Sequence, residues 1–160
     1  NYLQYEDYIG TYTATVDDYD EGPTSQSVTI TPKVRGESYT LKSIGGFNFT
    51  LLYDKASGKL ILDSQSISPV SSSSYYFACA AGVEGYAHTE LSLPSRLRSG
   101  LVNVTVKINP FTFYFADKAS QENTSLIIWA YSSDEYSTSG LMGYWSWYNS
   151  ILMEKENEGN

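Results

Sequence analysis

The sequence has few of the residues that most catalytic and metal sites require. It contains one cysteine, Cys79, and one histidine, His88, among 160 residues. A single cysteine excludes a disulfide within the chain. A zinc site takes three or four protein ligands, and these two residues cannot supply a usual set. With one histidine, most histidine-based catalysis is also excluded.

Positive charge and long apolar runs are also scarce. Ten Lys and Arg residues stand against eighteen Asp and Glu residues, which gives a formal net charge of −8 at pH 7. Because nucleic acids and anionic membrane surfaces would repel such a chain, neither is an expected partner. The longest apolar stretches, 75–83 and 126–131, fall far short of the roughly 20 residues that a membrane-spanning helix needs.

Apolar and polar residues alternate along most of the chain. Within 102–108, three valines and an isoleucine occupy every second position, with Asn, Thr and Lys between them. The same period of two runs through 8–16, 26–34, 38–43, 47–53 and 111–115. This pattern predicts β-strands with one buried and one solvated face. Two further strands are predicted at 125–131 and 143–153, with apolar residues on both faces.

Short turns join these strands. Gly58 stands late in a hairpin loop at 54–59, and the pair Gly45-Gly46 marks another tight turn. A series of local hairpins avoids exposed edges by closing on itself. We therefore predict one all-β domain over 1–160, an antiparallel meander closed into a barrel of about eight to ten strands, with a β-sandwich as the alternative. One short helix is predicted at 93–99.

Gly10-Thr11-Tyr12, at the start of the first strand, resembles the lipocalin and calycin signature. In that family a Gly-x-Trp closes one end of an eight-stranded barrel. Here Tyr12 replaces the Trp, and the family's closing arginine is missing, with Lys155 the nearest cation. The acidic, Tyr-rich chain with an aromatic strand at 143–149 is similar to lipocalin-like domains of secreted lipoproteins from gut Bacteroidetes. The resemblance implies a secreted, periplasmic or cell-surface (outer-membrane) lipoprotein whose lipid anchor, upstream of Asn1, is its membrane contact.

Catalytic constellations are not recognisable in the sequence. His88 is not accompanied by a Gly-x-Ser-x-Gly elbow. Four carboxylates could form a glycosidase pair by position alone: Glu37, Asp63, Glu84 and Glu90. We therefore expect no catalytic residue, no cofactor and no enzyme, and a hydrolase is the third of three functional hypotheses.

An acidic loop, 17–22, follows the first strand. Closely spaced carboxylates before a glycine are typical of calcium ligands, although the twelve-residue loop and flanking helices of an EF-hand are absent. A calcium site at Asp17, Asp18 and Asp20 is thus one interpretation, and a solvated, negatively charged hairpin loop is the other.

Aromatic residues are the most informative feature. Strict alternation puts Trp145 and Trp147 on one face of the last strand and Tyr144 and Tyr148 on the other. One face would pack the core, and the other would offer rings to a ligand. The same alternation of faces predicts that the barrel mouth is lined by Tyr12, Phe49, Phe113, Trp145 and Trp147.

Two non-catalytic functions follow from this prediction. The first is a secreted or cell-surface protein that binds a small apolar or glycan ligand in the barrel mouth. The second is a protein-interaction or assembly module of a surface complex, its barrel filled by its own aromatic rings. A ligand site requires a cavity of at least about 300 Å³ that opens to the surface, whereas a docking module requires none.

Overall fold

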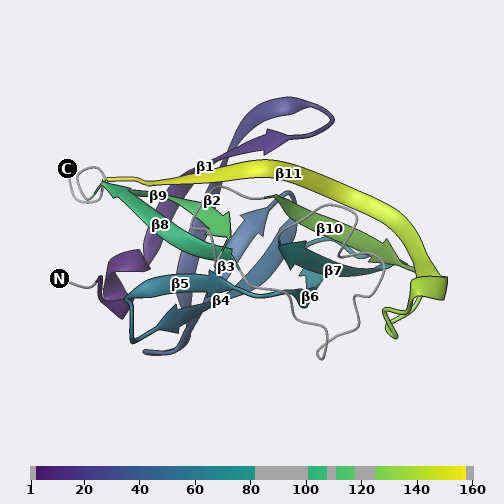
Figure 1. The fold of residues 1–160 in the computed structure, drawn as a ribbon, viewed down its shortest axis with the longest axis horizontal. Coiled ribbons are helices and arrows are strands. Elements are labelled where there is room, and N and C mark those ends of the chain that lie inside the picture. The colour runs from purple at the N-terminus through teal and green to yellow at the C-terminus, as the bar shows by residue number, and fades with distance from the viewer. Residues whose placement is uncertain (1–2, 82–100, 108–110, 118–124, 158–160) are drawn as a thin grey trace.

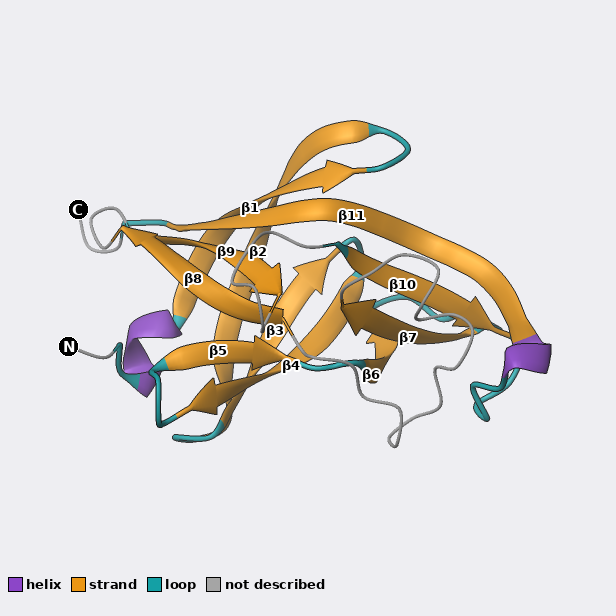
Figure 2. Ribbon diagram, viewed as in Figure 1, coloured by secondary structure: helices purple, strands orange, loops and turns teal. Residues whose placement is uncertain are grey.

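The alternating sequence folds into antiparallel strands. The computed structural model describes residues 3–81, 101–107, 111–117 and 125–157, which form eleven strands and two 3-10 helices (Figures 1 and 2). The helices are η1 (Tyr5–Tyr8) and η2 (Thr138–Gly140). The strands are β1 (Gly10–Asp18), β2 (Gly22–Val34), β3 (Ser38–Ile44), β4 (Phe47–Asp54), β5 (Lys59–Leu62), β6 (Gln65–Pro69), β7 (Tyr76–Ala81), β8 (Leu101–Lys107), β9 (Thr112–Asp117), β10 (Leu126–Tyr131) and β11 (Leu141–Lys155). The helix predicted at 93–99 and His88 lie outside the described residues.

Eight of these strands close into a ring. Their order is β1-β2-β3-β4-β5-β8-β9-β11, and β11 pairs back to β1. Each pairing in the ring is antiparallel. A ring without a free edge is a barrel. The predicted all-β barrel is therefore confirmed, and the β-sandwich alternative is wrong.

The ring follows a simple meander from β1 to β5, and then the sheet forks. β5 pairs with residues 52–54 of β4, whereas β6 pairs with residues 47 and 48 of the same strand. At the other end of the fork, β9 pairs with residues 152–154 of β11, and β10 pairs with residues 141–148. Two arms, β5-β8-β9 and β6-β7-β10, thus bridge β4 to β11, whose 15 residues span both (Figure 1).

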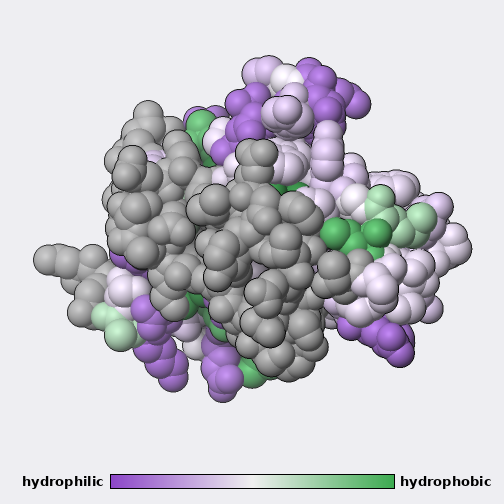
Figure 3. Space-filling view, turned by 45° about the vertical axis from the view of Figure 1, so that its right-hand side comes forward, coloured by the Kyte–Doolittle hydropathy of each residue, from purple (hydrophilic) through white to green (hydrophobic). Residues whose placement is uncertain are grey.

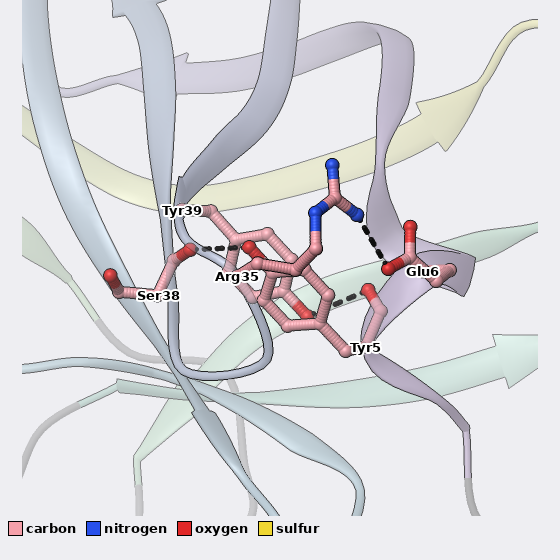
Figure 4. A network of polar contacts seen from close by, with 5 residues as sticks. All are labelled: Tyr5, Glu6, Arg35, Ser38 and Tyr39. Carbon is pink, nitrogen blue, oxygen red and sulfur yellow. Dashed lines mark hydrogen bonds and ion pairs between the residues drawn. The ribbon is translucent and has the colours of Figure 1, made fainter.

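The interior of the barrel is rich in aromatic rings, and η1 closes one end. Its two tyrosines point inward: Tyr5 donates a hydrogen bond to the carbonyl of Ser38 at 2.6 Å, and Tyr8 donates one to Gly58 at 2.6 Å. Tyr39 donates in return to the carbonyl of Tyr5 at 2.9 Å, with the two rings stacked 4.4 Å apart (Figure 4). Because each phenol has an acceptor, the rings can be buried without leaving a hydroxyl unsatisfied.

Lys155, at the end of β11, reaches the same end of the barrel. Its ammonium donates to the carbonyl of Asp7 at 2.8 Å and lies 5.5 Å from the ring centre of Phe111. The cation nearest to the position of the missing arginine thus contacts η1 and an aromatic ring. It joins the last strand to the first turn of the chain.

The buried tyrosines should make the fold sensitive to alkali. Burial raises the pKa of Tyr39, and it raises the pKa of Tyr131 from 10.0 to about 12. Since the folded state favours the neutral phenols, their contribution to stability is complete below the unfolded pKa and is lost as pH rises through the folded one. We expect the free energy of unfolding to fall from about pH 10 upward, as measured by denaturant titration at each pH.

Tyrosinate absorbance provides the check on this prediction. The ionisation of the buried tyrosines should coincide with the loss of the circular dichroism of the sheet. Full ionisation near the ordinary pKa in a chain that keeps its native dichroism would contradict the burial of these phenols.

Candidate functional site

A cavity opens at the end of the barrel opposite η1. Its volume is about 280 Å³, just under the size that we required for a ligand site. Its walls come from the β3–β4 turn, the end of β6, the serine run at 71–74, β7 and β11. The lining residues are Gly45, Gly46, Phe47, Pro69, Val70, Ser71, Ser72, Ser73, Phe77 and Trp145.

The β3–β4 turn forms one wall of this cavity. Gly45 and Gly46 have φ angles of 60° and 84°, the left-handed pair that a two-residue hairpin turn needs. The N–H of Gly45 donates to Oε1 of Gln26 at 2.8 Å, and the carbonyl of Gly46 accepts from the N–H of Val70 at 2.8 Å. These bonds fix the turn against β2 on one side and against the start of the serine run on the other.

Trp145 reaches the cavity from a bulge in β11. In the β10–β11 ladder, Ser146 pairs with Ile128 and Tyr144 pairs with Trp129, so Trp145 is an extra residue. The bulge aims its indole at the cavity, where it packs edge-on against Phe77 with ring centres 5.3 Å apart. The residue nevertheless remains 53% exposed.

The bulge also corrects the predicted faces of the last strand. Trp147 packs on the outside of the barrel, 5.4 Å from Tyr144 and 6.5 Å from Trp129 between ring centres. Tyr148 is buried in the barrel core instead. Trp145 and Trp147 therefore lie on opposite faces, and the prediction that they share one is wrong. An extra residue inverts the alternation beyond it.

The other residues predicted to line the mouth belong to the core. Tyr12 and Phe113 are fully buried with ring centres 5.7 Å apart, and Phe49 is 2% exposed. The hydroxyl of Tyr12 donates to the carbonyl of Tyr8 at 2.7 Å, at the η1 end. The alternation along each strand correctly predicted that these rings face inward. In this structure, however, they pack in the core and do not line an open mouth. Of the five predicted residues, Trp145 alone lines this cavity.

Several cavity residues were not predicted. Phe47 and Phe77 face each other across the wall with ring centres 4.8 Å apart. The glycine pair was predicted only as a tight turn, and no site was predicted at the serine run. Their sequence signals a change of direction, but it does not show that the two segments meet.

Two carboxylates of the acidic loop accept hydrogen bonds within the fold. Oδ1 of Asp18 accepts from the N–H of Asp20 at 2.8 Å and from that of Glu21 at 3.1 Å. The carboxylate of Asp20 accepts from the hydroxyl of Tyr144 at 3.0 Å. Across the described residues, no group of three or more His, Cys, Asp or Glu side chains is placed to hold a metal ion. The calcium interpretation of Asp17, Asp18 and Asp20 gains no support from this arrangement.

The candidates for catalysis lie partly outside the described residues. His88, Glu84 and Glu90 lie outside them. Cys79 is buried, and burial raises the pKa of its thiol to about 12, so it is not a thiolate at neutral pH.

The described residues include no helix with the length and apolarity to cross a membrane.

No curated protein and no solved structure matches the chain. A family model does match, over residues 1–129, which include the cavity-lining residues of the β3–β4 turn, β4, β6 and β7 but not Trp145 of β11. The chain therefore belongs to DUF4987, a family described as a domain of unknown function.

Proposed function

We propose that this domain is a non-catalytic binding protein that holds a small neutral glycan against Trp145. The observation that carries the proposal is a half-exposed indole beside an open cavity of about 280 Å³. A cavity of this size lies just below the range for small-molecule sites, about 300 to 1,000 Å³. It suits one or two sugar rings better than a long lipid chain.

The chemistry of the lining favours a sugar over a purely apolar ligand. A sugar ring has an apolar C–H face and a rim of hydroxyl groups. The indole of Trp145 offers a flat apolar surface for the face, and the serine run at 71–73 offers hydroxyl groups for the rim. All ten lining residues are uncharged, and the chain has a net charge of −8, which disfavours anionic ligands.

The setting of this activity is part of the proposal. On the resemblance of the sequence to lipocalin-like domains of secreted lipoproteins, we propose that the domain acts outside the cytoplasm, at the cell surface or in the periplasm. The proposed ligand needs no cofactor. A small apolar ligand in the same cavity is the alternative within this class, and the titration below includes it.

Tryptophan fluorescence tests the proposal. Titration with a panel of neutral oligosaccharides should change the emission of the wild-type protein for at least one member. Replacement of Trp145 with Ala should weaken that binding about tenfold, because stacking on the ring is lost. The affinity of the variant is measured by calorimetry, since it has lost the reporting indole.

Two variants and one further probe sharpen this test. Replacement of Trp147 with Phe, on the opposite face of the same strand, should leave the affinity unchanged. Replacement of Trp145 with Phe should restore part of it. A flat response to the whole panel by folded protein would contradict the glycan proposal, and a response to a fatty acid alone would favour the apolar alternative.

A protein-interaction module remains the second candidate function. It is favoured by a group of partly exposed aromatic rings on the outside of the barrel, at β11 and the tip of the β1–β2 hairpin, away from the cavity.

A further inference from the structure

Three aromatic rings form a cluster on the outside of the barrel, beside the tip of the β1–β2 hairpin. We define this aromatic corner as Tyr19, Tyr144 and Trp147. The ring centre of Trp147 lies 5.4 Å from that of Tyr19 and 5.4 Å from that of Tyr144. The first pair is tilted by 36° and the second by 81°, so the three rings present faces at different angles.

Two rings of the corner are exposed, Trp147 between them is half-buried, and the cluster is held in place. Tyr19 is 62% exposed and Tyr144 is 39% exposed. The N–H of Tyr19 donates to the carbonyl of Trp147 at 2.9 Å, which ties the hairpin to β11. Beneath the corner, the buried Trp129 contacts Tyr144 and Trp147. A ligand would meet rings that are already in place, so little ordering would accompany binding.

Negative charge borders the rings. Four of the five residues at 17–21 are acidic, and residues 1–32 contain no Lys or Arg. Figure 3 shows hydrophilic residues gathered over the hairpin tip at the top of the molecule. The carboxylate of Asp20 accepts from the hydroxyl of Tyr144 at 3.0 Å, and a carboxylate has sites for further donors. This hydrogen bond raises the pKa of Tyr144 above its ordinary value of 10.0, so the hydroxyl stays protonated over a wider pH range and continues to donate to Asp20.

Rings and carboxylates attract the same kind of ligand. The face of an aromatic ring carries negative electrostatic potential and attracts a cation placed over it. The nearby carboxylate adds a direct charge interaction. We propose that the aromatic corner docks an arginine side chain of a partner protein. This inference is independent of the glycan site, because Trp145 and Trp147 lie on opposite faces of β11.

The shape of the corner favours arginine over other cations. A planar guanidinium group stacks on a ring face and at the same time donates in a fork to a carboxylate, whereas an ammonium group cannot stack. Tyr19 and Tyr144 are exposed on either side of the half-buried Trp147, so the cluster is open to solvent. An open surface suits a side chain presented by a neighbouring protein. The charge of the domain, −8, complements a basic surface.

A peptide titration followed by NMR tests this inference. The probe is a blocked tetra-arginine peptide added to isotope-labelled protein. We expect the indole N–H signal of Trp147 to shift and that of Trp145 to stay. Replacing Asp20 with Asn, or Tyr19 with Ala, should each weaken binding about three- to fivefold. Both side chains are exposed, so the fold should tolerate these changes.

Matched probes and a matched variant decide the outcome. A peptide of citrulline, which has the shape of arginine without its charge, should not bind, and a tetra-lysine peptide should bind more weakly. Glu37→Gln removes one charge at the η1 end of the barrel and should leave affinity unchanged. Equal binding of lysine or citrulline, equal weakening by Glu37→Gln, or an unmoved Trp147 signal would each overturn the proposal.

Discussion

Replacing Tyr8 with alanine should lower the free energy of unfolding by about 3 to 5 kcal/mol, the range for removing a fully buried aromatic ring. Tyr8 has no exposed surface. Its ring contacts Phe111 and Phe113 edge-on, with ring centres 5.7 and 5.9 Å away. The variant would leave a cavity at the closed end of the barrel and would deprive the carbonyl of Gly58 of its 2.6 Å hydrogen bond. Urea denaturation monitored by circular dichroism measures the loss.

Two control variants separate the ring from its hydroxyl. Tyr8→Phe keeps the ring and removes the hydrogen bond, so it should lower stability by only about 1 to 2 kcal/mol. Tyr19→Ala removes an exposed tyrosine and should have little effect on stability. If Tyr8→Ala unfolded at the same urea concentration as the wild type, η1 would not be part of the cooperative core.

The faces of single strands could be predicted from the sequence because alternation is a local property. In β1, the positions of Tyr12, Ala14 and Val16 are buried, and the threonines between them are half-buried. In β4, Phe47, Phe49 and Leu51 are buried in the same way. Closure into a barrel could also be predicted, because the unpaired backbone groups at the edges of a long series of strands need partners.

The fork and the bulge could not be predicted in this way. Partner choice between β4 and β6 rests on two residue pairs, Phe47 with Pro69 and Asn48 with Ser68, and such long-range pairing leaves no local pattern. The bulge at Trp145 depends on how β10 and β11 align, and one inserted position reverses the faces of the neighbouring residues. Both features build the cavity, so the site was less predictable than the fold.

Composition likewise could not divide the tyrosines between core and surface. Tyr8, Tyr12 and Tyr39 are fully buried because a backbone carbonyl stands within reach of each hydroxyl. Tyr19 and Tyr144 are exposed beside the acidic hairpin. The difference comes from which acceptors the fold places near each phenol, and the sequence does not encode this locally.

Replacing Gly45 with alanine should lower the free energy of unfolding by about 2 to 4 kcal/mol and deform the cavity. Two effects add. A φ of 60° is unfavourable for a residue with a Cβ, and the new Cβ would overlap the hydroxyl oxygen of Tyr148. The ring of Tyr148 is buried in the core, so it cannot simply swing away. The stability is read from urea denaturation, and glycan binding is measured on the same sample.

A matched glycine and a double variant distinguish the two effects. Gly36 has a φ of 83°, and no described atom lies within 4 Å of a Cβ placed there, so Gly36→Ala should show the backbone effect alone, about 1 to 2 kcal/mol. In a double-mutant cycle, Tyr148→Phe should recover the part of the Gly45→Ala loss that comes from overlap, because it removes the obstructing oxygen. Equal losses for Gly45→Ala and Gly36→Ala, with no recovery in the double variant, would show that Tyr148 does not press on the turn. If the double variant recovers stability, the β3–β4 turn and the ring of Tyr148 hold each other in place. The shape of the cavity then depends on a contact between residues more than a hundred positions apart in sequence.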